Sequence, residues 1–160
     1  MMTNSPEARR TDRASKVLKA SPHTIYQAFV DPEAWLQWLP PDGMEGRILA
    51  FDAREGGVYR MALTYLDRGQ AGRGKTSEDT DVVEGTFVRL IPDERIVQRV
   101  VFDSDDPAFA GAMTMTWSLE PVPEGTRVTI VCEDVPAGIR KEDHDVGLRS
   151  SLDQLGAFTE

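Results

Sequence analysis

The feature that most constrains the fold of this chain is a series of alternating segments between residues 44 and 135. In the segment 112–121, Met113, Met115 and Trp117 fall on one side, while the residues between them carry hydroxyl groups. Successive side chains of a strand point to opposite faces, so this spacing is typical of a strand with one buried face. Because turns rich in glycine and proline separate the segments, we expect an antiparallel sheet with one face in water. The expected strands are 46–52, 57–66, 82–91, 94–103, 112–121 and 126–135.

Two short helices are expected before these strands. Ser21 and Asp31 are each followed by proline, and a Ser or Asp cap with proline at the first helical position marks a helix N-terminus. A proline pair at 40–41 ends the second helix. Residues 14–20 precede the first helix and predict a short strand, while the polar residues 1–12 are expected to form a disordered tail.

The C-terminal part of the chain has a different period. From residue 138 to residue 160, leucines recur at helical spacing, at Leu148, Leu152 and Leu155. Apolar residues three and four positions apart lie on one face of a helix, so one long amphipathic helix is predicted here. A chain of 160 residues has the length of one domain, and neither a repeat nor a linker divides it.

The balance of charges limits the partners. The formal net charge is −9, from 18 basic and 27 acidic residues, whereas phosphate groups are bound by basic surfaces. We therefore expect neither a nucleic-acid partner nor a membrane partner. A single cysteine, Cys132, excludes an intrachain disulfide, and no Cys/His spacing predicts a metal site or a cofactor. The polar N-terminus lacks a secretory signal and no apolar run could span a bilayer, which together predict a cytoplasmic protein.

One motif points to a different function. The stretch GQAGRGKT, residues 69–76, matches the phosphate-binding loop pattern G-x-x-x-x-G-K-[ST]. Such a loop joins a buried parallel strand to a helix, whose N-terminus helps to bind the phosphates. The residues after it, SEDTDVVEGTFV, predict a polar loop and then a strand, so no helix follows. We interpret the match as a coincidence within a long hairpin loop over about residues 67–81.

The order of these elements and several stretches of sequence resemble a known family. The stretches are ASPHTIYQAFVDPEAWLQWLPP, the segment Val83-Glu84-Gly85, IPDERIVQRVVF and DHDVGLRSSLDQLGAF, within residues 14–158. They resemble the homologues of the activator of heat-shock protein 90 ATPase, in the START-like (SRPBCC) superfamily. The resemblance implies an α+β helix-grip fold, in which a curved antiparallel sheet wraps around a long C-terminal helix and two short helices follow the first strand. It implies one such domain over residues 13–160.

In a helix-grip fold the sheet and the long helix leave a gap, and the resemblance implies a ligand cavity there. Methionine and aromatic residues suit an adaptable apolar pocket. The alternative is that these side chains simply pack as core. The candidate ligand-binding residues are Trp35, Trp38, Tyr59, Met61, Gln98, Phe102, Met113, Met115, Trp117, His144, Leu148 and Leu152.

Three polar or reactive side chains need separate consideration. Gln98 falls among apolar neighbours, so its amide either pairs with another side chain or contacts a ligand. His144 lies four residues before Leu148 on the same helix face, where it serves as an acid or base or else stays at the surface beside acidic residues. Cys132 is expected to be a small buried residue rather than a nucleophile. No catalytic set of residues can be assigned.

Three functions remain open at this point. The first is binding of a small hydrophobic or aromatic ligand between the sheet and the C-terminal helix. The second, implied by the resemblance, is regulation of a chaperone through the protein surface. The third is a cyclase- or hydrolase-type enzyme that uses the same cavity, with His144 and a nearby acid. Binding ranks first because polar side chains are sparse on the inner face. A homodimer through a free sheet edge is a further prediction, although the sequence does not show which strand is free.

Overall fold

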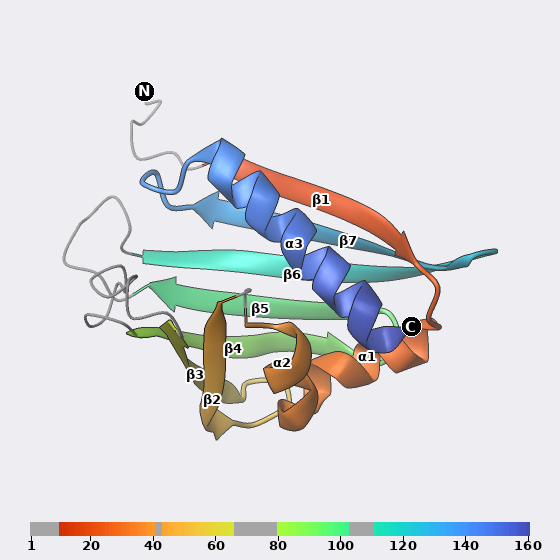
Figure 1. The fold of residues 1–160 in the computed structure, drawn as a ribbon, viewed down its shortest axis with the longest axis horizontal. Coiled ribbons are helices and arrows are strands. Elements are labelled where there is room, and N and C mark those ends of the chain that lie inside the picture. Colours follow the sequence, from red (N-terminus) through yellow and green to blue (C-terminus); the bar gives the residue numbers. More distant parts are fainter. Residues whose placement is uncertain (1–9, 41–42, 66–79, 103–110) are drawn as a thin grey trace.

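The structure is a computed structural model that describes residues 10–40, 43–65, 80–102 and 111–160 (Figure 1). Within these ranges the chain forms one curved antiparallel sheet and three helices. The strands are β1 (Arg10–Leu18), β2 (Met44–Phe51), β3 (Val58–Tyr65), β4 (Thr80–Ile91), β5 (Arg95–Phe102), β6 (Gly111–Val122) and β7 (Gly125–Val135). The helices are α1 (Pro22–Val30), α2 (Pro32–Trp38) and α3 (Lys141–Thr159). The predicted α+β helix-grip architecture is confirmed.

The sheet has the strand order β1-β7-β6-β5-β4-β3-β2, and every neighbouring pair is antiparallel. The six strands expected from β2 to β7 are confirmed, each within two residues of its predicted ends. The pattern succeeds because alternation and turn residues are local signals. The two edges of the sheet are β1 and β2. Pairing of either edge with a second copy stays a prediction.

The first strand begins earlier than its sequence predicts. It starts at Arg10, so the last residues of the expected tail belong to β1. Arg10 lies opposite Val135, and Asp12 lies opposite Cys132, which pairs this polar segment with the end of β7. No local pattern signals a partner at the far end of the sequence, which explains the error. Residues 1–9 lie outside the described residues.

Both predicted helix starts are confirmed. The Ser21 side chain accepts a hydrogen bond from the backbone N–H of Thr24, and the Asp31 side chain accepts one from Glu33. Proline occupies the start of each helix, where an N–H has no helical partner. Asp31 is both the C-cap of α1 and the N-cap of α2, so the two helices meet at a corner. This corner, called the α1–α2 corner below, places α2 against β2.

Helix α3 runs obliquely across the inner face of the sheet (Figure 1). It begins at Lys141, slightly later than expected, and it contacts β1, α1 and α2. The predicted leucine stripe is confirmed as its buried face, since Leu148, Leu152 and Leu155 are at most 4% exposed. No helix in the described ranges is long and apolar enough to cross a bilayer.

The phosphate-loop match falls within residues 66–79, which lie outside the described residues. The strands on either side are described, and β3 and β4 are antiparallel neighbours, paired from Val58 opposite Thr86 to Thr64 opposite Thr80. The segment therefore connects two antiparallel strands, whereas a phosphate-binding loop connects a strand to a helix. This arrangement agrees with the interpretation of the match as a coincidence.

Candidate functional site

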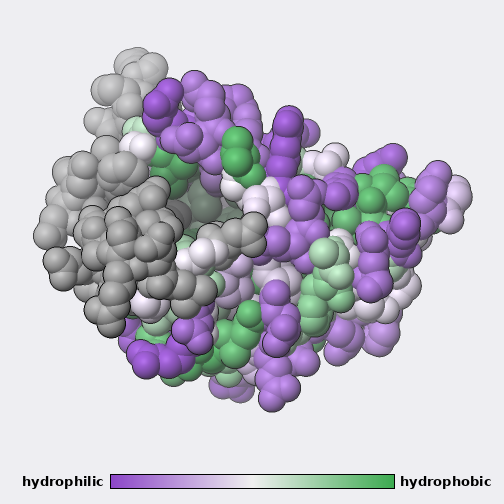
Figure 2. All heavy atoms as spheres, viewed as in Figure 1, coloured by the Kyte–Doolittle hydropathy of each residue, from purple (hydrophilic) through white to green (hydrophobic). Residues whose placement is uncertain are grey.

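The inner face of the sheet contains an apolar cavity of about 230 Å³. It lies between strands β3–β6 and the α1–α2 corner. Figure 2 shows a hollow on the face that α3 crosses, with apolar side chains at its base. The cavity is lined by Phe29, Trp35, Trp38, Leu39, Tyr59, Met61, Leu63, Val83, Gln98, Val100, Met113, Met115 and Trp117.

Two tryptophans fix the helical wall of the cavity. Trp35 Nε1 donates a hydrogen bond to the backbone carbonyl of Phe29 at 2.8 Å, and Trp38 Nε1 donates to that of Ala28 at 2.9 Å. These carbonyls belong to the last turn of α1, where a helix has no partners of its own for its carbonyl groups. The two indoles of α2 therefore hold α1 and α2 together, and each stays buried with its polar N–H satisfied.

Edge-to-face contacts between aromatic rings make the wall rigid. The ring centroid of Phe29 lies 4.8 Å from that of Trp117 and 5.1 Å from that of Trp38. A second set of aromatic contacts involves Trp35, whose ring centroid lies 4.8 Å from the ring centroid of Tyr59. Such pairs contribute about 0.5–1.5 kcal/mol each beyond the burial of their surface. The aromatic part of the lining is thus held in place by mutual packing.

Gln98 is the lining residue whose side chain ends in an amide group. It lies on β5 opposite Phe87 of β4 and Met115 of β6, and it is 5% exposed. Its Oε1 accepts a hydrogen bond from Trp117 Nε1 at 3.0 Å. Of the two alternatives for this amide, pairing with another side chain is therefore present in the structure. Contact with a ligand stays a prediction.

A glycine makes room for an aromatic ring in this wall. Tyr59 of β3 lies opposite Gly85 of β4, and its ring extends across the glycine. A Cβ atom at Gly85 would lie 2.3 Å from the Tyr59 hydroxyl oxygen, so no side chain fits there. Burial raises the pKa of the Tyr59 hydroxyl, which therefore stays neutral at physiological pH.

Eight of the twelve predicted ligand-binding residues line the cavity, and these are Trp35, Trp38, Tyr59, Met61, Gln98, Met113, Met115 and Trp117. The side chain of Phe102 lies outside the described part of the chain. Leu148 and Leu152 do not line the cavity, because they pack in the core, 4% and 1% exposed. The helical wall is thus the α1–α2 corner and not α3, which packs towards β1.

His144 also lies away from the cavity, in a charged cluster between β1 and α3. Its Nδ1 is 2.6 Å from Oδ2 of Asp12, a residue that is 1% exposed. Arg10 Nε donates to Oδ1 of the same carboxylate at 2.9 Å, and Arg10 Nη2 donates to the backbone carbonyl of Ile139. Burial raises the pKa of Asp12, but hydrogen bonds and positive charge from Arg10 and His144 outweigh it, so this pKa lies below its ordinary value. Contrary to expectation, His144 joins the first strand to the last helix.

Five lining residues were not among those predicted, namely Phe29, Leu39, Leu63, Val83 and Val100. Three of them carry a signal in the sequence. Phe29 lies on the apolar face of the first helix, and alternation places Leu63 and Val100 on the inner faces of their strands. Val83 and Leu39 carry no signal beyond being apolar.

Gln154 supports the cavity from outside and was not singled out in the sequence. Its Nε2 donates to the backbone carbonyls of Trp38 and Pro40, at 2.5 and 2.9 Å. These carbonyls lie at the end of α2, so the Gln154 side chain links α3 to the helical wall. A lone glutamine in a helix gives no sequence signal for such a role.

Cys132 is a buried residue of β7, as expected. It is 0% exposed, and burial raises the pKa of its thiol to about 12, with the Asp12 carboxylate adding to the shift. The thiolate is the reactive form of cysteine, and almost none is present at neutral pH. We expect no reaction of the native protein with iodoacetamide near pH 8 and complete reaction in denaturant, measured as a mass increase. Labelling of the native protein at the rate of a free cysteine would contradict this.

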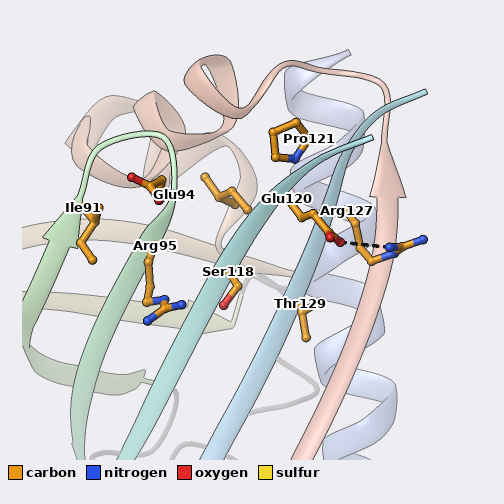
Figure 3. Close-up of a pocket in the computed structure, with 9 residues that line it drawn as sticks. Ile91, Glu94, Arg95, Ser118, Glu120, Pro121, Arg127 and Thr129 are labelled. Atoms are coloured by element: carbon orange, nitrogen blue, oxygen red, sulfur yellow. Dashed lines mark hydrogen bonds and ion pairs between the residues drawn. The ribbon is translucent and has the colours of Figure 1, made fainter. Parts of the chain in front are cut away.

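A second recess lies on the outer face of the sheet and has a volume of about 490 Å³ (Figure 3). It is lined by Ile91, Glu94, Arg95, Ser118, Leu119, Glu120, Pro121, Arg127 and Thr129. Arg127 Nη1 lies 3.0 Å from Glu120 Oε1, so two of the charges at its rim neutralise each other. Glu94 and Arg95 add one negative and one positive charge to the lining, and no ion pair is recorded between them. The lining of this recess therefore carries charges of both signs. In the described ranges no three His, Cys, Asp or Glu side chains gather to hold a metal.

Comparisons with known proteins place the chain in a family. The model of the family described as Activator of Hsp90 ATPase homolog 1-like protein matches residues 19–160. The chain belongs to this family. A crystal structure of a protein from Chromobacterium violaceum is 36% identical, with a TM-score of 0.80, over 94% of this chain and 97% of the other. No curated protein matches.

More distant structures share the START-like fold alone. A protein from Rhodobacter sphaeroides is 17% identical with a TM-score of 0.76, over 96% of this chain and 93% of the other. An AHSA1-like protein from Aeromonas hydrophila is 15% identical with a TM-score of 0.69, over 93% of this chain and 91% of the other. The family model and the 36% identical structure confirm the expected resemblance to the family and its START-like fold.

Proposed function

We propose that this family member binds a small hydrophobic or aromatic molecule in the cavity between the sheet and the α1–α2 corner. The observation that carries the proposal is the lining, in which aromatic and aliphatic side chains surround one buried amide. Binding sites for small molecules are concave and mostly apolar, with a few polar groups that orient the ligand. Membership of a START-like family supports the proposal, because such proteins often bind hydrophobic ligands.

The volume of the cavity limits the size of the ligand. An apolar cavity of about 150 Å³ is large enough to bind benzene, whereas drug-sized ligands occupy about 300–1,000 Å³. This cavity, at about 230 Å³, falls between these values. A molecule of one or two rings with short substituents therefore fits without rearrangement of the walls.

Native mass spectrometry of the freshly purified protein, compared with the same sample after denaturation, is the first test. A mass excess that disappears on denaturation identifies a bound molecule. For protein that is purified empty, ethylbenzene serves as a probe in methyl NMR, because Met61, Met113 and Met115 line the cavity and Met44 does not. We expect the three lining methyl signals to shift and the Met44 signal to stay. A bare mass together with unshifted methyl signals would refute the proposal.

A pair of neighbouring valines gives a matched test by mutation. Val100 lines the cavity and is 6% exposed, whereas Val101 points to the outer face and is 38% exposed. Val100→Phe places a ring in the cavity, so we expect the affinity for ethylbenzene to fall at least tenfold. Val101→Phe adds the same ring outside and should leave the affinity unchanged. Equal affinities of both variants, measured by NMR titration, would show that the probe binds elsewhere.

A further inference from the structure

The buried amide of Gln98 determines which polar group a ligand of this cavity must present. The geometry points to an uncharged ligand with a hydrogen-bond acceptor oxygen, such as the carbonyl of an aromatic or cyclic ketone, that binds to Nε2 of Gln98. This inference rests on the proposed function, because it concerns the same cavity. It depends on the orientation of the amide, on the surroundings of Nε2 and on the other polar groups of the lining.

The orientation of the amide follows from its neighbour. The two ends of a glutamine amide have nearly the same shape, and their hydrogen-bond partners decide which end is oxygen. The indole N–H of Trp117 can only donate, and it lies 3.0 Å from one end of the Gln98 amide. That end must be Oε1, the acceptor. The other end is therefore the NH₂ group, which carries two donor hydrogens and no acceptor.

The NH₂ group of Gln98 has no acceptor among the described residues. Gln98 is 5% exposed to solvent, and the residues opposite it on the neighbouring strands, Phe87 and Met115, are apolar. Within the described residues the structure records no acceptor for Nε2, and none of their fully enclosed side-chain nitrogens or oxygens lacks a partner. Nε2 is consequently not sealed in the packing, and Gln98 is one of the residues that line the cavity. A donor in such surroundings gains a partner when a ligand brings an acceptor.

Among the other polar groups of the lining, the Tyr59 hydroxyl can both donate to and accept from a ligand, whereas the three indole N–H groups are already paired. The indole N–H groups of Trp35 and Trp38 donate to backbone carbonyls at 2.8 and 2.9 Å, and that of Trp117 donates to Gln98. The described residues that line the cavity include no Asp, Glu, Lys or Arg, so none of them offers a counter-charge to a charged ligand that loses its hydration. A ligand group that can only donate would find no acceptor at Nε2 of Gln98. A neutral ligand with a carbonyl oxygen fits both constraints.

Two probes of nearly equal shape test the inference. Acetophenone carries a carbonyl acceptor, and ethylbenzene has no polar group. The measured quantity is the ratio of their dissociation constants, determined by NMR titration in the wild type and in Gln98→Met. Transfer of each probe from water is common to both proteins, so it cancels between them. We expect Gln98→Met to weaken acetophenone binding relative to ethylbenzene by about tenfold, the size of one hydrogen bond to a buried donor. Gln37→Met, at an exposed position of α2, should leave the ratio unchanged.

The outcomes separate this inference from the proposed function. If neither probe binds the wild type, the proposed function fails and the inference with it. If both bind but the ratio is the same in Gln98→Met, the cavity binds ligands and the inference is wrong. Should Gln98→Met fail to fold, the side-chain NH₂ signals of Gln98 in the wild type decide. Acetophenone should shift them downfield and ethylbenzene should not, whereas equal shifts would overturn the inference.

Discussion

Gly85→Ala should lower the free energy of unfolding by about 1–3 kcal/mol, the usual effect of an added methyl group in a filled core. The new Cβ would lie 2.3 Å from the Tyr59 hydroxyl oxygen and 2.9 Å from the backbone carbonyl oxygen of Arg99. The Tyr59 ring cannot simply move, because the rings of Trp35 and Phe87 pack on it at 4.8 and 5.0 Å. We therefore expect the loss in the free energy of unfolding to lie near the upper end of this range.

Chemical denaturation of the variant measures this loss. A second glycine provides a control, because its replacement by alanine should raise the free energy of unfolding instead of lowering it. Gly147 lies on an exposed position of α3, and no heavy atom lies within 4 Å of a Cβ built there. Alanine has a higher helix propensity than glycine, so Gly147→Ala should raise the free energy of unfolding by up to about 1 kcal/mol. A Gly85→Ala protein as stable as the wild type would mean that the Tyr59 ring does not occupy this position.

Asp12→Asn should be about as damaging, with a loss of roughly 3 kcal/mol at neutral pH, because removing one member of a buried charged cluster leaves the others without their partner. Asp12 is 1% exposed and binds both Arg10 and His144. Asparagine keeps the shape of the side chain but loses its charge and one acceptor. Asp153→Asn is the matched control, because its ion pair with Lys16 is exposed and should contribute little.

The lowered pKa of the Asp12 carboxylate also makes the free energy of unfolding depend on pH. The pKa of Asp12 is lower in the folded protein than its ordinary value of 3.8. Its contribution is therefore fully present above about pH 4 and is lost as the pH falls through the folded-state pKa. In a series of unfolding curves from pH 6 to pH 2, the wild type should lose more stability than Asp12→Asn. Parallel curves for the two proteins would contradict the assignment of the ionised carboxylate to this cluster.

Most of the fold was predictable because its signals are local. The helix caps at Ser21 and Asp31 need only the next three residues, and strand alternation needs only the strand itself. The beginning of β1 was not predictable, since Asp12 is buried by contact with His144, 132 residues away. Nothing near Asp12 in the sequence distinguishes it from a residue of a polar tail.

In the candidate site, too, the residues with local sequence signals were predictable and those placed by tertiary contacts were not. Alternation places Tyr59, Met61 and Met113 on the inner face, and all three line the cavity. The direction in which α3 crosses the sheet is a tertiary property, and the sequence carries no signal for it. Leu148 and Leu152 therefore looked equivalent to lining residues, although they pack in the core beside β1. Ligand contact at the eight lining residues that were predicted stays a prediction.

The pairing of β1 with β7 has a consequence for where this domain can be cut. The family match starts at residue 19, immediately after β1 ends at Leu18. A protein shortened to the matched residues would lose the strand that covers β7, and it would expose the backbone groups of β7 as a template for intermolecular pairing and aggregation. It would also lose Leu18, which is 0% exposed and packs against Gly156 of α3. We therefore expect that a shortened protein needs β1, from Arg10 onward, to keep β7 covered.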